Sequence, residues 1–395
     1  MRILHTSDWH AGKLWKGRSR LDELEAVLDD LAGAVEREKV DLVLMSGDVF
    51  DTSSPPPEAE RVVFGFFRRI GALGVPSVVI AGNHDSAQRV EAWGQLAELA
   101  HVHALGLPRH RLHGGLIEIP SRRGVRVLVG AVPFAPVNRL VSAAELGDRS
   151  QRAMQKYADA MAGLLRHVSE GFDEQAVNLL MAHTHLEGAL IAGSERRIHL
   201  GDDWAARPEM LPAGAHYVAL GHIHRPQRVT ASPSPTYYAG SVMQLDFGEE
   251  NQRKTWNLID ARPRQPARVE ARPYVGARPL RTVTVPGATL QVDPACLADR
   301  PHLRVIVEAE PHLVDPDLSR RVRAGIDGVV TVDLRLPASS DADRRDARTR
   351  ADGTLAPRVL YDTFHRRKHG VPAAEAVLAV FDDLYEQAIA TETGE

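Results

Sequence analysis

The chain has 395 residues, 44% of them hydrophobic, and a net charge of −4 at pH 7, which fits a soluble globular protein of two or three domains and does not by itself indicate nucleic-acid binding. Its single cysteine, Cys296, excludes an internal disulfide framework, and no apolar run approaches the about 20 residues that a membrane helix needs. Because no basic-then-apolar signal follows Met1, we expect a cytoplasmic protein without a membrane segment.

The first predicted element is a buried strand in RILHTSDWH, and its end carries Asp8 and His10. Their i,i+2 spacing places both side chains on one face of an extended segment, where they can bind one metal cluster. The following segment, AGKLWKGRSR, is basic, and we expect its cations to hold DNA phosphates at the rim of the site. These candidates are Lys13, Lys16, Arg18 and Arg20. The alternative is a solvated loop before a helix that begins at Leu21.

The second predicted strand, DLVLMSGDVFD, ends at Asp48. A carboxylate offers two oxygens, so Asp48 is the natural bridge between two cations. Asp51 either supports a metal-binding histidine as its hydrogen-bond acceptor or is the N-cap of the next helix. The spacing of the apolar residues predicts that helix from Glu58 to Leu73.

The third predicted strand, VPSVVIAGNHD, leads to Asn83 and His84. Adjacent side chains of an extended turn diverge, so His84 faces the substrate if the amide oxygen of Asn83 faces the metals. His84 is then the candidate to protonate the leaving oxygen or to stabilise charge on the phosphate, and Asp85 is the candidate to orient it. The alternative is that His84 and Asp85 cap the following amphipathic helix, which is predicted over residues 88–100.

Two later predicted strands, AVNLLMAHTH and HYVALGHIH, end in histidines. These are His183, His185, His222 and His224, and Arg225 follows them as a further DNA-binding candidate. Open α/β sheets bind ligands at the carboxyl ends of their strands, so all these strand ends can pool their side chains at one edge. Oxygen and imidazole ligands without thiolates suit Mn²⁺, Fe or Zn²⁺. Two such cations about 3.5 to 4 Å apart can activate a water and clamp the oxygens of a phosphate ester.

The last third of the chain carries none of these ligand motifs. A proline- and arginine-rich stretch near Arg262 predicts a domain boundary, so we assign residues 1–265 to the metal-binding domain. Residues 278–337 predict a small α/β unit, residues 338–356 a flexible polar linker, and residues 357–395 terminal helices. The last helix has an apolar stripe formed by Val377, Val380, Phe381, Leu384 and Ile389. Such a stripe packs either on its own chain or in the groove of a partner.

The ordered motifs DWH, GDVFD, GNHD, a strand-end histidine and GHIH resemble those of the calcineurin-like metallophosphoesterase family. The segments YYAGSVMQLDFGE and FHRRKHGVP resemble its SbcD nuclease branch. The resemblance implies an α/β fold, a four-layer αββα sandwich with a small capping domain and C-terminal helices. It implies one metal held by Asp8, His10, Asp48 and His224 and another held by Asp48, Asn83, His183 and His222, with His84 as the catalytic histidine. His183 is preferred to His185 because its distance to Gly188 and Ala189 matches the family pattern, and His185 remains a candidate to support a ligand.

The resemblance also implies an activity and partners. We expect a Mn²⁺-dependent DNA exonuclease and endonuclease acting on double-stranded ends and hairpins in DNA repair, recombination and replication. Residues 278–337 would help to bind DNA, helices near residues 88–100 would form a homodimer, and the terminal helices would bind an SbcC-type coiled-coil ATPase in a heterotetramer. A phosphatase could use the same ligands, but it leaves the basic segment and the terminal helices without a role. A DNA-end-binding module with a decayed site would not need every ligand.

Overall fold

The computed structural model describes residues 1–120, 124–136, 140, 151–192, 194–195, 205–308, 317–335 and 357–392. The chain divides into two compact units, Met1–Pro279 and Leu280–Glu395. In the described residues, no helix has the length and hydropathy needed to cross a membrane.

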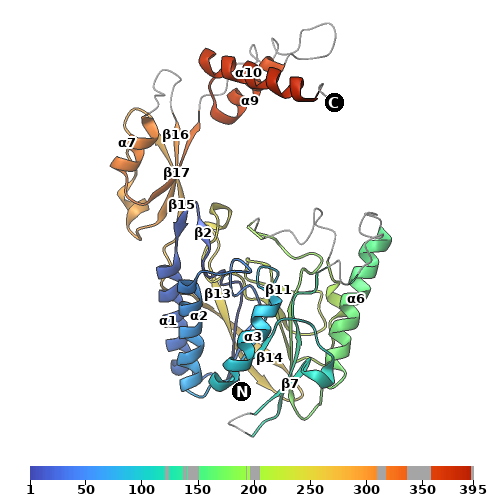
Figure 1. The fold of residues 1–395 in the computed structure, drawn as a ribbon. Coiled ribbons are helices and arrows are strands. Elements are labelled where there is room, and N and C mark those ends of the chain that lie inside the picture. Colours follow the sequence, from blue (N-terminus) through green and yellow to red (C-terminus); the bar gives the residue numbers. More distant parts are fainter. Residues whose placement is uncertain are drawn as a thin grey trace. The chain divides into compact units, whose positions relative to one another are not determined.

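Two mixed six-stranded sheets form the centre of the first unit (Figure 1). The first sheet has the order β14 (Gln265–Pro273), β13 (Thr255–Arg262), β1 (Arg2–Thr6), β4 (Leu42–Met45), β5 (Ser77–Ile80) and β6 (Val102–Leu105). The second has the order β11 (Gln227–Val229), β12 (Thr236–Tyr238), β10 (Tyr217–Gly221), β9 (Val177–His183), β8 (Val127–Val132) and β7 (Leu116–Ile119). The five strands that the sequence predicts ahead of the ligands are β1, β4, β5, β9 and β10, and all five are confirmed.

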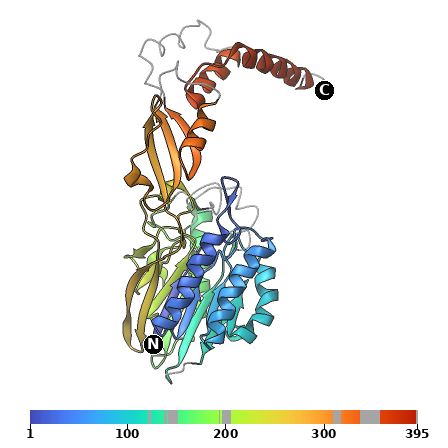
Figure 2. The same cartoon turned by 90° about the vertical axis from the view of Figure 1, so that its left-hand side faces the viewer.

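Helices cover the outer face of each sheet. Helices α1 (Leu21–Arg37) and α2 (Pro57–Ala72) lie side by side over the first sheet (Figure 2), and α3 (Ala87–Ala97) follows β5. Helix α6 (Gln151–Ser169) packs on β8 of the second sheet. Separate apolar clusters fill the space between α1, α2 and the first sheet, between the two sheets, and between the second sheet and α6. This is the expected four-layer αββα sandwich.

The topology brings the carboxyl ends of the ligand-bearing strands together. Strands β1, β4 and β5 are parallel neighbours, and so are β9 and β10. Their residues are almost entirely buried on both faces, as is typical of parallel strands between layers. The polar residues that follow each strand are therefore collected at one edge of the sandwich.

A buried polar network joins the two sheets beneath that edge. On β1, His5 forms hydrogen bonds of 2.8 Å through Nδ1 to the hydroxyl of Tyr217 on β10 and through Nε2 to the hydroxyl of Ser46. Asn257 on β13 also donates to the Tyr217 hydroxyl, at 3.1 Å. Burial lowers the pKa of His5 to about 3, so the imidazole is neutral and uses one nitrogen as donor and the other as acceptor. The network fixes the stacking of one sheet on the other.

The composition shift near Arg262 does not mark a domain boundary. Residues 265–273 form β14, which pairs antiparallel with β13 at the edge of the first sheet, and the first unit ends at Pro279. Its residues are exposed or half-buried, because β14 is an edge strand that buries little apolar surface. The sequence of β14 therefore lacks the run of apolar residues by which a covered strand is recognised.

The second unit contains a three-stranded parallel sheet of β15 (Leu280–Pro286), β16 (His302–Glu308) and β17 (Val329–Arg335). Helix α7 (Leu318–Gly325) supplies Leu318 and Val322 to its apolar core. These are the strands and the helix that the sequence predicts between residues 278 and 337.

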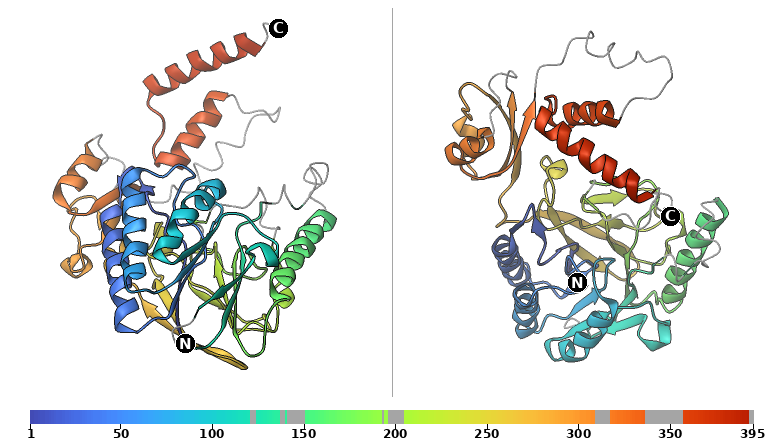
Figure 3. Two further views of the ribbon diagram at one scale, coloured as in Figure 1. Left: turned by 60° about the horizontal axis from the view of Figure 1, so that its bottom comes forward. Right: turned by 45° about the horizontal axis from the view of Figure 1, so that its top comes forward.

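Two terminal helices, α9 (Pro357–His369) and α10 (Glu375–Glu392), form a hairpin (Figure 3). The rings of Tyr361 and Phe381 stack with centroids 4.4 Å apart, and Arg358 forms ion pairs with Glu375 and Asp382. Leu378 is also buried, whereas Val380 and Leu384 are 58% and 60% exposed. Within the predicted stripe, Phe381 thus packs between the two helices, whereas Val380 and Leu384 form an exposed face. The predicted linker, residues 338–356, and the side chain of Ile389 lie outside the described residues.

Candidate metal centre

The ligand-bearing residues have unusual backbone conformations. Asp8, His10, Asp48 and His222 have φ values of 52°, 47°, 52° and 102°, a region that non-glycine residues seldom occupy. The predicted extended segment at Asp8 and His10 is therefore wrong, because both residues have positive φ. Their side chains nevertheless converge, as predicted. Such strain persists only where the surroundings impose it, and it is concentrated at functional sites.

Glycines precede Asp48, Asn83 and His222, and they permit the close approach of the loops. A Cβ at Gly47 would collide with the imidazole of His183, and Gly47 has φ +100°. A Cβ at Gly221 would collide with the carbonyl oxygen of Ser46. The GD and GH pairs of the motifs thus let the ends of β4, β9 and β10 meet.

Asp8, His10 and His224 form one group of donor atoms, all within 4.8 Å of one another and buried. Nε2 of His10 lies 3.0 Å from Nε2 of His224, so the two imidazoles point at the same place. The Asp8 carboxylate accepts the backbone N–H of His222 at 3.1 Å, which ties the end of β1 to the end of β10. We call this the first metal position.

Asn83, His183 and His222 form a second group, the second metal position. The amide oxygen of Asn83 lies 3.0 Å from Nε2 of His183 and 2.9 Å from Nδ1 of His222. The other nitrogen of the His183 ring, Nδ1, is 2.8 Å from the carbonyl oxygen of Ser46, so it donates there and leaves Nε2 as an acceptor. His185 lies farther out, with its ring centroid 6.2 Å from that of His222. This placement favours His183 over His185 as the ligand.

Asp48 lies between the two positions. Its Oδ2 is 3.7 Å from Nε2 of His10 and 3.6 Å from Nε2 of His183. Its Oδ1 accepts the backbone N–H of His84 at 2.9 Å. One carboxylate oxygen thus faces both histidines, which is the arrangement expected of a bridging ligand.

The carboxylates of Asp8 and Asp48 are buried, which disfavours their charged forms. Burial raises the pKa of Asp8 to about 6 and raises the pKa of Asp48 well above its usual value. A carboxylate in such a place is stabilised by a cation. The donor set of carboxylate, amide and imidazole groups fits Mn²⁺, Fe or Zn²⁺.

His84 stands beside the ligands, and its Nδ1 donates to the carbonyl oxygen of Asp51 at 2.8 Å. Its ring is 4.6 Å from that of His10 and perpendicular to it. The carbonyl of Asp51 therefore orients His84, a role that the sequence assigns to Asp85. Asp85 instead accepts the backbone N–H groups of three residues that flank the ligand loops, Val49, Phe50 and Gly82.

The alternative roles as helix caps do not hold. Ser86 is the N-cap of α3, where its hydroxyl accepts from the backbone N–H of Arg89. The N-cap of α2 is Pro56. The carboxylate of Asp51 accepts from Nδ1 of His10 at 3.1 Å, a contact that fits the first of its two interpretations, support of a candidate metal-binding histidine.

The basic segment forms a small hairpin of β2 (Leu14–Trp15) and β3 (Arg18–Ser19), with Lys16 and Gly17 at its turn. Lys16 and Arg18 are exposed, and so is Arg225 on the loop after β10. Lys13 is committed to an ion pair of 2.9 Å with Asp51. The free cations at the rim are therefore fewer than the sequence suggests.

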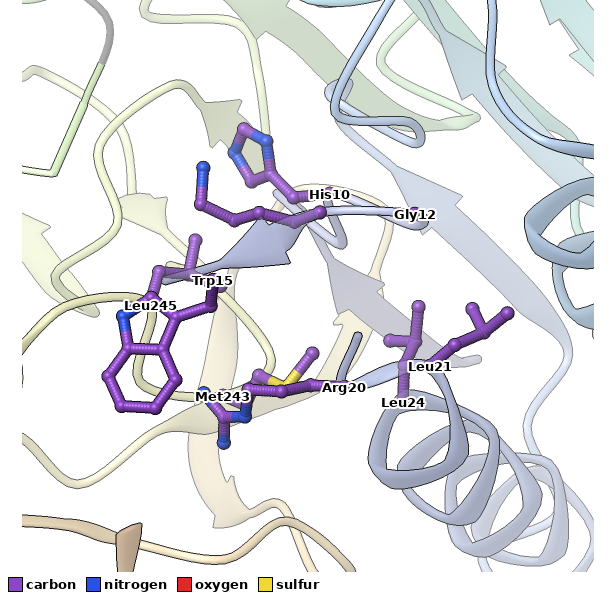
Figure 4. Close-up of a pocket in the computed structure, with 9 residues that line it drawn as sticks. His10, Gly12, Trp15, Arg20, Leu21, Leu24, Met243 and Leu245 are labelled. Carbon is purple, nitrogen blue, oxygen red and sulfur yellow. The ribbon is translucent and has the colours of Figure 1, made fainter. Parts of the chain in front are cut away.

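Arg20 is buried and is not available to DNA, which corrects its assignment as a DNA-binding residue. Its guanidinium pairs with Glu23 at 2.8 Å and donates to the carbonyl oxygens of Gln244 and Arg278. It also lies 5.3 Å from the centre of the Trp15 ring, and Figure 4 shows both side chains beside Met243. Arg20 joins the hairpin to the core instead.

Four residues around His224 are not among those that the sequence motifs indicate. Ser194, Glu195, Glu249 and Lys254 contact either its imidazole or its backbone. Burial opposes ionisation of Glu249, but its interaction with nearby His224 and the charge of Lys254 lower its pKa to about 2. Glu249 lies in the segment YYAGSVMQLDFGE, which has no periodic or spacing signal of a role at the site.

Comparison with known proteins identifies the family of the chain. The family model described as calcineurin-like phosphoesterase matches residues 1–226. The chain is 36% identical over 269 residues to the SbcD subunit of the nuclease SbcCD from Bacillus subtilis (strain 168), with 68% of each chain covered. It is 34% identical over 333 residues to the protein of the same name from Rhodobacter capsulatus, covering 76% of this chain and 77% of that one. A solved dimetal phosphatase from Danio rerio aligns with a TM-score of 0.40 at 12% identity over 68% of this chain and 98% of its own, too low to carry weight.

Proposed function

The chain belongs to the calcineurin-like phosphoesterase family, in the branch of the SbcD nuclease subunits, and we propose that it is a two-metal DNA phosphodiesterase. The observation that carries the proposal is the place of Asp48, whose Oδ2 lies 3.7 Å and 3.6 Å from the facing nitrogens of His10 and His183. One oxygen at nearly equal distance from two ligand groups fits a pair of cations that share it. Mn²⁺ is the metal we propose.

The chemistry proposed is hydrolysis of a phosphodiester bond. Two bound cations would supply a nucleophilic water and charge stabilisation at the phosphate. Asp8, His10, Asp48 and His224 would hold one cation, and Asp48, Asn83, His183 and His222 the other. His84 has its Nδ1 proton committed to the carbonyl of Asp51, so Nε2 is the nitrogen that can carry a second proton to the leaving oxygen or hydrogen-bond the phosphate.

The proposed substrate is double-stranded DNA, cleaved from its ends and at hairpins. Exposed Lys16, Arg18 and Arg225 support this choice, because phosphate contacts by cations position a DNA backbone without reading its sequence. A small-molecule phosphatase would also attract its substrate with these cations, but it would leave the terminal helices without a role. The sheet of the second unit, at residues 278–337 in our assignment, would add to DNA binding.

The proposed assembly is a homodimer that joins two copies of an SbcC-type coiled-coil ATPase in the cytoplasm for DNA repair, recombination and replication. Leu96 and Leu99, near the end of α3, are 74% and 85% exposed and support a protein contact there. The exposed face of the α9–α10 hairpin, with Val380 and Leu384, supports a helix-in-groove contact with the ATPase.

The direct test compares substrates and metals. The purified chain is incubated with linear duplex DNA, hairpin DNA and a generic phosphomonoester, each with and without Mn²⁺. We expect cleavage of both DNAs with Mn²⁺ and little turnover of the phosphomonoester. Preferential hydrolysis of the phosphomonoester would favour a phosphatase, and DNA binding without cleavage at any metal concentration would favour a binding module.

A further inference from the structure

A buried ion pair lies directly behind the first metal position. Nζ of Lys254 is 2.7 Å from Oε2 of Glu249, and the two residues are 7% and 0% exposed. Removing two charges from water costs several kcal/mol per ion, and an apolar pair of similar size is often at least as stable. Stability alone is therefore a weak reason for this pair.

Both members of the pair hold His224. Lys254 donates through Nζ to the backbone carbonyl oxygen of His224 at 2.8 Å. Glu249 accepts a hydrogen bond from the hydroxyl of Ser194, and its Oε1 is 3.6 Å from Nδ1 of His224. The backbone of His224 is also held by Glu195, which accepts its N–H at 3.0 Å. His224 is thus fixed at its backbone and at its ring.

The chain of donors also sets the proton on the ring. The Ser194 hydroxyl gives its hydrogen to Glu249, so its oxygen accepts from Nδ1 of His224 at 2.7 Å. The proton of a neutral imidazole then resides on Nδ1, and Nε2 presents its lone pair toward Nε2 of His10. This is the tautomer that a metal ligand requires.

We propose that the Lys254–Glu249 pair is a positioning device for His224 and thereby controls the metal affinity of the first metal position. The proposal rests on the proposed two-metal function. The second position has no equivalent pair among the described contacts, because Nδ1 of His183 donates to a backbone carbonyl, that of Ser46. Disruption of the ion pair should therefore weaken one metal and leave the other unchanged.

The test is a Mn²⁺ titration of the full-length protein, followed by electron paramagnetic resonance. Two Mn²⁺ ions that share a bridging ligand are magnetically coupled, whereas a single bound ion gives an uncoupled signal. For Glu249→Gln we expect one of the two affinities to fall about 10- to 100-fold, as is typical when a partner of a metal-binding histidine is lost. The coupled signal should then appear only at higher Mn²⁺, and added Mn²⁺ should restore the cleavage rate.

Two further variants separate positioning from folding. Glu23→Gln disrupts the Arg20–Glu23 pair, which is also poorly exposed and contacts the backbone of Gln244 and Arg278, so it should lower stability without changing either Mn²⁺ affinity. The double variant Glu249→Leu, Lys254→Met removes both charges together, so it should fold. It should bind one Mn²⁺ with normal affinity and the other weakly.

The outcomes are distinct. Normal binding of both ions by the double variant, or equal weakening of both in Glu249→Gln, would show that the pair only stabilises the fold and would overturn the inference. Failure of the unmodified protein to bind two Mn²⁺ ions would instead refute the proposed two-metal function itself.

Discussion

The backbone N–H of His84 donates a hydrogen bond of 2.9 Å to Oδ1 of Asp48. This contact uses one oxygen of the carboxylate and leaves Oδ2 facing His10 and His183. It also fixes the start of the segment that carries the His84 side chain. Asp48 therefore sets both the bridging geometry and the place of His84, whereas the side chain of His84 makes neither contact and can be substituted without removing the bridge.

The variant His84→Gln should keep both metals and lose most DNA cleavage. Its backbone N–H still donates to Asp48, but glutamine cannot transfer a proton as imidazole does. We expect a fall of about 10²- to 10⁴-fold in the cleavage rate at saturating Mn²⁺. The measurements are the cleavage rate and the number of bound Mn²⁺ ions. A matching loss of bound metal would show that His84 is a ligand instead.

Asp48→Ala should lose metal and activity together, because it removes the proposed bridge and the acceptor for His84. Asp48→Asn is the matched control: an amide oxygen can still accept that N–H, but the bridging negative charge is gone. We expect both variants to bind Mn²⁺ poorly and only Asp48→Ala to displace the His84 segment, detectable by NMR of the His84 imidazole. Two tightly bound ions in either variant would refute the bridging role.

The sequence predicts the strands and the clustering of the candidate ligand residues because both signals are local. A short apolar run such as LVLM before Asp48 defines a buried strand, and parallel strands bring their ends to one edge whatever the remaining topology is. The positions of Asp8, His10 and His183 follow from that rule. The detailed backbone does not, since the left-handed conformation of Asp8 and His10 is imposed by neighbouring loops.

The contacts of charged residues could not be predicted in this way. Arg20 and Lys16 lie in the same basic segment, yet Arg20 is buried against Glu23 and Lys16 is exposed. The carbonyls that fix Arg20 come from Gln244 and Arg278, more than 200 residues away in the sequence. Long-range partners of this kind also explain why no local pattern points to Lys254 and Glu249.

Replacing Lys16 and Arg18 with alanine should weaken DNA binding equally for all sequences. Both side chains are exposed at the rim, so their phosphate contacts would release counterions. We expect the slope of log K against log salt to fall in magnitude by about 2. An unchanged slope would make the hairpin a solvated turn. Lys13 is left intact, because its ion pair with Asp51 lies next to His10.

Arg20→Ala is the control for that experiment. It removes one partner of a buried pair, so it should cost about 3 to 5 kcal/mol of stability. It should leave the salt dependence of DNA binding unchanged once the folded fraction is taken into account. A reduced salt slope with normal stability would return Arg20 to the set of DNA contacts.

His5 should make the protein less stable in mild acid. Its pKa is lowered by burial from 6.5 to about 3, so between these pH values the unfolded chain binds a proton that the folded chain does not. The contribution of His5 to the free energy of unfolding is therefore fully present above pH 6.5. It is lost as pH falls, by about 2 kcal/mol at pH 5. In metal-free protein, urea unfolding of His5→Gln should show a smaller loss between pH 7 and pH 5. Tyr217→Phe keeps His5 and should keep the wild-type slope, whereas equal slopes in all three proteins would contradict the assignment.

The structure of the terminal hairpin shows which residues of the apolar stripe can be substituted to test the contact with the ATPase. Phe381 stacks on Tyr361, so its substitution would damage the hairpin itself. Val380 and Leu384 are exposed, and changing both to aspartate should cost little stability. A helix in a partner's groove concentrates its binding in a few apolar anchors, so this double variant should no longer co-purify with an SbcC-type ATPase. Its own Mn²⁺-dependent cleavage of DNA should be unchanged. If the variant instead melts at a lower temperature and still binds the ATPase, the exposed face packs within the chain and the partner contact lies elsewhere.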